Sequence, residues 1–464
     1  MAGNGKVEEE KEELKKGGLR TMPFVLASEL CDRFALAGFN ANMVQYLQNE
    51  LHLHLVQATN TLNFFGGTAS LTPIVGGLIA DSFAGRFMTI AAGSFIYLLG
   101  MIGVTVSAIL PGLRPPPCEL KSETCQGATT CQLLVFYGSL LLTAAGSGGI
   151  RPCVVAFGAD QFELDRQKAQ HGGRRSFFNL YFFSMGFSTL LALTVAVYVQ
   201  DNVGWGLGFG IPSVAMFVSI VAFVAGYPLY IRRKPGGSPL IRLAQVVVAA
   251  VRKRKIQLPG DANLLYQNKE IDLDISTAGR LLHTDHFTSA KSLAAVDGPR
   301  VEELKSILRI LPLWSVGIFL ITAASHNHTF AIIQAKSMDR HLFGSFQIPA
   351  ATLTIFSVLA MLLTIVIYDR VLVPLARRLT GLDSGITYLQ RMGLGLAISL
   401  SSNISASIVE YRRRRAASMI TGRLGATVPM SVFWLVPQYA VHGIGDGFYS
   451  VGHMGSFMTN RRRA

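Results

Sequence analysis

The chain has 464 residues, of which 50% are hydrophobic and 15% are charged, and its formal net charge at pH 7 is +14. Soluble domains carry about 25% charged residues, so this composition excludes an ordinary soluble domain. The basic excess does not indicate nucleic-acid binding, because Lys and Arg gather in the cytoplasmic loops of membrane proteins.

Charged residues are absent from a series of long intervals, beginning with the stretch between Glu50 and Asp81. A helix needs roughly 20 apolar residues to cross a bilayer, and most of these intervals reach that length. We therefore predict an all-α membrane protein. The expected spans lie near residues 23–47, 58–81, 87–111, 132–157, 176–199, 205–231, 308–332, 346–368, 388–409 and 428–450.

One long polar interval separates the first six expected spans from the last four. It defines four expected parts: a cytoplasmic tail (1–22), an N-terminal six-helix bundle (23–231), a cytoplasmic central loop (232–305) and an incomplete C-terminal helix bundle (306–464). Loop charges favour a cytoplasmic N-terminus, although the run Arg412–Arg415 then falls outside. Two bundles joined by a charged loop are typical of transporters that rock around a site at the membrane midplane.

Span one contains Glu29, Asp32 and Arg33. Ionisable residues inside a membrane are costly, so they indicate a functional site. Spacings of three and four place Glu29 on the same helix face as the other two. A carboxylate pair beside a guanidinium can lose and regain a proton at tolerable local charge. These residues are candidates for proton coupling, and the alternative is a structural ion pair at a helix end.

Spans four and ten contribute two further candidates for substrate binding or gating. Arg151 follows the glycine-rich segment 146–149, which we interpret as close helix packing and not as a phosphate loop. Arg151 is a candidate binding cation or partner for Glu29, or else part of a structural ion pair. Asp446 is a candidate gate, and the alternative is a cap at a cytoplasmic helix end.

The cysteines and histidines give weaker signals. Cys118, Cys125 and Cys131 lie in a loop assigned to the outside, where a disulfide and three free thiols are both open interpretations. His326 and His328 project in different directions on a helix, so we expect no metal site there. We expect no cofactor, and no nucleophile–base set indicates an enzyme.

Several motifs then occur in a familiar order. They are Glu29–Arg33, Leu71–Asp81 followed by Gly85 and Arg86, Ala156–Phe162, Phe177–Asn179, Gln200–Pro212, Lys234–Pro239 and Val436–Tyr439. From about Gly18 to His453, the chain resembles the plant nitrate transporter/peptide transporter family. That family is a branch of the proton-coupled oligopeptide transporters within the major facilitator superfamily.

The resemblance implies a fold of six plus six spans, so we expect six plus four here and a chain that stops two helices short. It implies a proton-coupled secondary transporter working by alternating access, driven by the proton gradient. Glu29, Asp32 and Arg33 would couple the proton, with Arg151 and Asp446 binding solute or gating. The expected partners are the lipid bilayer, protons and a small solute, with no nucleic acid and an open oligomeric state. The plasma membrane is the default location, with vacuolar and plastid membranes as exceptions.

Departures from the family pattern bear on the solute. Asp32 and Asp446 stand where glutamates are usual, and Arg151 stands where lysine is common. Leu36 replaces a tyrosine of peptide-transporting members, as does Ala37, and Ala324 replaces the histidine of a nitrate-binding member.

Relatives that look similar carry nitrite or gibberellins, so we expect a small anionic solute such as nitrite, nitrate or an acidic hormone. The alternative function is a truncated, non-transporting membrane regulator or ligand-binding partner of a full-length relative.

Overall fold

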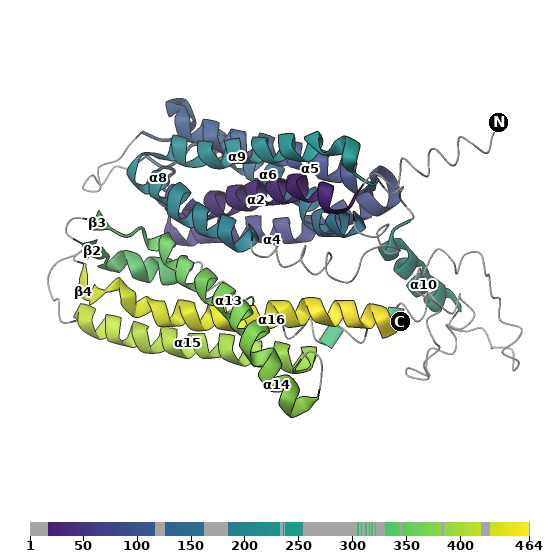
Figure 1. Ribbon diagram of the computed structural model, residues 1–464. Helices are drawn as coiled ribbons and strands as arrows, with labels where there is room; N and C mark the ends of the chain where they lie inside the picture. The colour runs from purple at the N-terminus through teal and green to yellow at the C-terminus, as the bar shows by residue number, and fades with distance from the viewer. Residues whose placement is uncertain are drawn as a thin grey trace, which may run out of the picture. The chain divides into compact units, whose positions relative to one another are not determined.

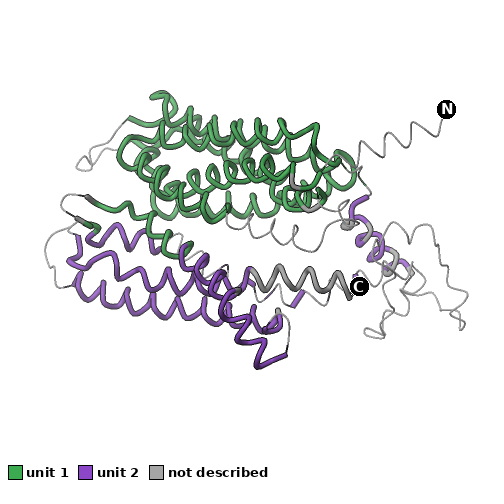
Figure 2. The backbone as a smooth tube through the Cα atoms, in the orientation of Figure 1, with its two compact units in different colours: residues 1–235, 340–358 green, residues 236–339, 359–464 purple. Residues whose placement is uncertain are grey.

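The computed structural model describes residues 17–116, 126–161, 184–232, 235, 237–253, 304–305, 308, 311–312, 315, 317–318, 321, 330–343, 346–381, 385–418 and 427–463. The chain divides into two compact units (Figure 2). The first comprises residues 1–235 and 340–358, and the second comprises residues 236–339 and 359–464. The four-part division expected from the sequence remains a prediction.

The first unit is a helix bundle. In chain order it contains η1 (Gly18–Arg20), α2 (Met22–Ala41), α3 (Met43–Asn49), α4 (Leu55–Ile79), η2 (Ala80–Ala84), α5 (Gly85–Ile109), η3 (Pro111–Leu113), α6 (Thr130–Asp160), η5 (Ala192–Ala196), α8 (Val197–Asn202), α9 (Trp205–Ala225) and η6 (Tyr227–Leu229). Helix α6 packs against α4 and α5, while α9 packs against α2 and α5 (Figure 1). The unit also includes the antiparallel pair β2 (His341–Phe343) and β3 (Phe346–Gln347), then η9 (Ala350–Thr354) and the start of α13 (Ile355–Ile367).

The surface of this bundle is apolar, as expected for contact with lipid. Phe64, Leu71 and Phe83 are among many large apolar side chains that are exposed. Many threonine and serine hydroxyl groups donate to carbonyl oxygens of their own helix, as where Thr89 Oγ1 donates to the Gly85 carbonyl oxygen at 2.9 Å. A segment in lipid must satisfy its polar groups internally, so this arrangement suits a membrane.

Five helices of the described part of the chain are long and apolar enough to cross a membrane. One of them, Leu55–Ile109, includes α4, η2 and α5. Gly85 interrupts it with φ of +74°, a conformation that glycine adopts without steric cost. The membrane prediction is therefore supported, while the count of six plus four spans remains a prediction.

The glycines of segment 146–149 pack against neighbouring helices. A Cβ atom at Gly148 would lie 2.6 Å from the Thr72 Cβ atom of α4. One at Gly146 would lie 2.3 Å from the Tyr97 backbone nitrogen of α5. Real Cβ atoms do not tolerate such distances, so the backbones approach this closely only because side chains are absent. The interpretation of these glycines as packing residues is confirmed.

The second unit contains helices and one short strand pair. Its elements are α10 (Pro239–Lys253), β1 (Met338–Asp339), the remainder of α13, η10 (Tyr368–Leu372), α14 (Val373–Thr380), α15 (Tyr388–Ser418), β4 (Val428–Ser431), η11 (Val432–Leu435) and α16 (Val436–Arg463). Helices α15 and α16 pack along each other, and β1 pairs with β4 in parallel. The sequence did not predict these strands, which are two to four residues long and lie in connections between helices. The all-α class is therefore unaffected.

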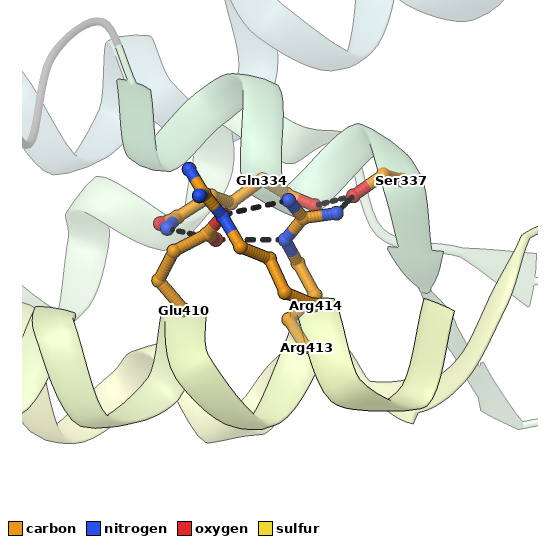
Figure 3. A network of polar contacts seen from close by, with 5 residues as sticks. All are labelled: Gln334, Ser337, Glu410, Arg413 and Arg414. Atoms are coloured by element: carbon orange, nitrogen blue, oxygen red, sulfur yellow. Dashed lines mark hydrogen bonds and ion pairs between the residues drawn. The ribbon is translucent and has the colours of Figure 1, made fainter. Parts of the chain in front are cut away.

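The arginine run that opposes the predicted topology is part of α15 and not of a loop. Glu410 accepts hydrogen bonds from Arg413 Nη2 at 2.8 Å, Arg414 Nε at 2.7 Å and Gln334 Nε2 at 2.7 Å (Figure 3). Arg412 stacks over the Trp434 ring, with its guanidinium carbon 4.8 Å from the ring centre. Two of the four arginines, Arg413 and Arg414, are thus paired with the Glu410 carboxylate. This pairing lowers the free-energy cost of moving the run to the outer side of the membrane. The orientation itself remains a prediction.

We expect Glu410→Gln to destabilise the chain by about 2 kcal/mol, because the neutral amide loses charge-assisted hydrogen bonds to Arg413 and Arg414. Thermal melting of the purified chain in detergent measures the effect. Arg415→Gln is the control, since Arg415 is exposed on the same helix. Equal melting of the two variants would show that the network contributes nothing to stability.

Candidate functional site

Glu29 and Arg33 form an ion pair in the interior of α2. Arg33 Nε donates to Glu29 Oε1 at 2.6 Å, and Glu29 is only 2% exposed. The pair follows from the i, i+4 spacing, which puts both side chains on one face of the helix. Helix α2 runs from Met22 to Ala41, so neither residue lies at a helix end. The pair is therefore not at a helix end, and its role in proton coupling or in structure alone remains a prediction.

Asp32 belongs to the same group of charges. It is half-buried, and the charges of Glu29, Arg33 and Arg151 all act on its carboxylate. The structure therefore brings the three proton-coupling candidates together with the cation of span four. Two acids and two cations share this region, so one proton can be gained or lost without leaving a large uncompensated charge.

Arg151 forms no ion pair with Glu29 among the contacts of the described residues, and that pairing remains a prediction. Its Nη1 donates to the Ala69 carbonyl oxygen of α4 at 3.4 Å, which is a long and weak contact. Its charge acts on Asp32 instead. The side chain is exposed. A guanidinium has five donors, so Arg151 retains most of its capacity to bind an anion.

Tyr97 of α5 was missed by the sequence analysis. Its side chain is 1% exposed, and its hydroxyl has no hydrogen-bond partner among the described residues. The charges of Asp32, Arg151 and Arg33 act on this hydroxyl. A buried hydroxyl without a partner is costly, which suggests a role beyond packing. The one available signal was a lone tyrosine in a span without charged residues.

Asp446 belongs to the second unit and lies in the interior of α16. Its Oδ1 accepts a hydrogen bond from Ser450 Oγ at 3.0 Å. Asp446 lies ten residues from Val436 and seventeen from Arg463, so the alternative of a helix cap is excluded. One turn earlier, the buried His442 shares a 3.0 Å hydrogen bond between its Nδ1 and Ser399 Oγ of α15. His442 was also missed, although its spacing of four from Asp446 was visible in the sequence.

A further ion-pair group joins the ends of three segments in the first unit. Arg86 of α5 donates from Nη1 to Asp160 of α6, and its Nη2 lies 3.9 Å from Asp81 Oδ1 of η2. These residues include the Asp81 and Gly85–Arg86 motifs found in the sequence. The group links the start of α5 to the last residue of α6, close to η2, which connects α4 to α5.

Five other residues considered in the sequence lie outside the described part of the chain: Cys118, Cys125, Ala324, His326 and His328. Cys131 is described, and its thiol is free and exposed. Among the described residues there is no cluster of three His, Cys, Asp or Glu side chains that could hold a metal ion.

Comparison with known proteins identifies the family. The sequence profile of the POT family matches residues 87–464. The chain is 50% identical to Protein NRT1/PTR FAMILY 3.1 of Arabidopsis thaliana, over 97% of this chain and 80% of that protein. It is 41% identical to Protein NRT1/PTR FAMILY 8.5 of the same plant, over 96% and 77%.

The fold agrees with this assignment. The crystal structure of the POT family transporter PepTSo superposes with a TM-score of 0.70 at 23% identity, covering 96% of this chain and 85% of that one. The resemblance inferred from the motifs is confirmed. The chain belongs to the POT family, whose members are membrane transporters and not enzymes.

Proposed function

We propose that the chain is a proton-coupled secondary transporter of a small anionic solute. It works by alternating access, with the proton gradient as its driving force and no cofactor. The observation that carries this proposal is the buried Glu29–Arg33 pair in the interior of α2. A buried carboxylate is a costly feature that a purely structural helix does not need.

Protonation of Glu29 is the coupling step. Loss of its negative charge weakens the pair and releases part of the Arg33 guanidinium for another anion. The solute therefore binds better after the proton, and the bound anion in turn favours the protonated carboxyl, because such coupling is reciprocal. One proton and one monoanion then cross together without net charge.

The anionic class of the solute is supported by the cations on the site. Arg33 and Arg151 stay charged at any accessible pH, unlike a buried lysine. Nitrite, nitrate and an acidic hormone fit this charge. Several solved structures of similar fold are titled peptide transporters, so a dipeptide belongs in the test as well. Leu36 and Ala37, which replace the expected tyrosines, pack against apolar clusters of the bundle.

The proposal is tested by uptake into proteoliposomes containing the full chain. Nitrite, nitrate, gibberellin and a dipeptide are supplied with an acidic exterior, and an internal pH dye reports proton entry. We expect one of the anions to accumulate and to carry protons inward. Saturable binding without proton movement would instead support a non-transporting ligand-binding membrane protein.

We expect Tyr97→Phe to weaken solute affinity while leaving the fold intact. The Tyr97 hydroxyl has no partner among the described residues, so its removal costs the folded state nothing. Loss of one hydrogen bond to solute or to a bound water would raise KM by about three- to tenfold. Initial rates of uptake and thermal melting measure the two effects. An unchanged KM would remove Tyr97 from the proposed site.

We propose the plasma membrane as the location, on the family resemblance alone. A fluorescent fusion imaged in plant cells tests this, and signal confined to the vacuolar or plastid membrane would contradict it.

A further inference from the structure

Helix α10 has an unusual distribution of side chains. Its sequence, Pro239–Lys253, contains Arg242, Arg252 and Lys253 but no acidic residue. At 100° per residue, these cations and Gln245 fall on one narrow stripe, and the remaining positions are apolar. The helix is therefore amphipathic, with a cationic stripe and a wide apolar face.

Most of the apolar face of α10 is not covered by the described part of the protein. Ile241, Val247, Val248 and Val251 are exposed, whereas Val246, at the edge of the face, is buried. Exposed valines and isoleucine over three turns are a liability in water. A helix of this composition is stabilised when its apolar face is buried in an apolar environment.

The membrane is within reach of α10. Helix α9 is long and apolar enough to cross a membrane together with η6. Only the residues between Leu229 and Pro239 connect η6 to α10. At no more than about 3.5 Å per residue, this connection keeps α10 within roughly 35 Å of the end of the span. In the sequence, the connection also contains the cations Arg232, Arg233 and Lys234.

We propose that α10 lies on the membrane surface, with its apolar face among the lipid acyl chains and its cations at anionic phospholipid headgroups. Basic amphipathic helices bind membranes in this way, with the apolar face at the headgroup boundary. The absence of acidic residues favours an anionic lipid surface over an acidic or neutral protein partner. This inference rests on the membrane location and not on the proposed transport function.

The experiment compares two positions on opposite faces of α10. Val247→Cys and Gln245→Cys, about 160° apart around the helix at 100° per residue, are made in a full chain whose natural cysteines are replaced by Ser. Each variant is labelled with an environment-sensitive fluorophore and reconstituted into vesicles of phosphatidylcholine with phosphatidylserine. Brominated lipids quench a label in the acyl region, and aqueous iodide quenches a label in water. Val251→Cys is a second variant on the apolar face, in case Val247→Cys fails to fold.

We expect brominated lipids to quench the label at position 247, with a blue-shifted emission, and iodide to quench the label at position 245. On anionic vesicles, joint Arg252→Gln and Lys253→Gln substitutions should lower the ratio of membrane-bound to unbound α10 by about fivefold for each lost charge. Equal iodide quenching at both positions would overturn the proposal. Protection of position 247 from both quenchers would also overturn it, because protein would then cover the face.

Discussion

Glu29→Gln is expected to reduce solute accumulation driven by a pH gradient to passive equilibration. A gradient of one pH unit carries about 1.4 kcal/mol per proton, which corresponds to about tenfold accumulation when one proton moves with one monoanion. The amide has the same shape as the carboxylic acid but cannot release a proton. It therefore holds position 29 permanently in the neutral state, and the gradient cannot act through this group.

Exchange of labelled for unlabelled solute should survive in Glu29→Gln, because exchange needs no net proton release. This separates loss of coupling from loss of folding or of solute binding. Glu50→Gln is the matched control: Glu50 also pairs with an arginine, through a 2.9 Å bond from Arg114 Nη1 to its Oε2, but lies outside the interior of α2. Wild-type accumulation by Glu29→Gln would remove Glu29 as the proton carrier. Loss of exchange together with accumulation would point to a structural role.

The sequence predicted what depends on one helix at a time. Long apolar intervals predicted helices such as α4, α5 and α9, because a chain in lipid must satisfy its backbone hydrogen bonds locally. The Glu29–Arg33 pair followed from a spacing of four, which fixes neighbours on a helix whatever surrounds it.

Contacts between helices were less predictable. The partner of Arg151 depends on how α6 lies against α2 and α4, and no spacing along the chain encodes that. The arrangement puts its charge on Asp32 and its hydrogen bond on the Ala69 carbonyl group. Tyr97 and His442 were missed for a similar reason, since a single polar ring in an apolar span shows its surroundings only after the helices pack.

The packing of the glycines in segment 146–149 could be predicted only in part from the sequence. Small residues in segment 146–149 indicated close packing, but only the structure shows that Gly76 of α4 lies against the Gly148 carbonyl group. This contact determines how closely α4 and α6 approach. Helix α6 carries Arg151, and α4 carries the Ala69 carbonyl group that Arg151 contacts, so the same packing positions part of the candidate site.

Gly76→Ala is accordingly expected to destabilise the first unit severely. A Cβ atom at this position would lie 2.0 Å from the Gly148 carbonyl oxygen and 2.6 Å from its carbonyl carbon. Both atoms are backbone, so no side chain can rotate away and the two helices must separate. Overpacking of this kind costs about 1–3 kcal/mol or more. The expected result is a lower melting temperature and less monodisperse protein on size-exclusion chromatography.

Gly66→Ala on the same helix provides the matched control. No atom lies within 4 Å of a Cβ atom at that position. Alanine favours a helix over glycine by about 1 kcal/mol, so Gly66→Ala should melt at the wild-type temperature or slightly above it. The same chemical change is then predicted to have opposite effects ten residues apart, and only the approach of α6 distinguishes the two sites. Similar melting of both variants would contradict the close contact between α4 and α6, and with it the placement of Arg151 beside the α4 backbone.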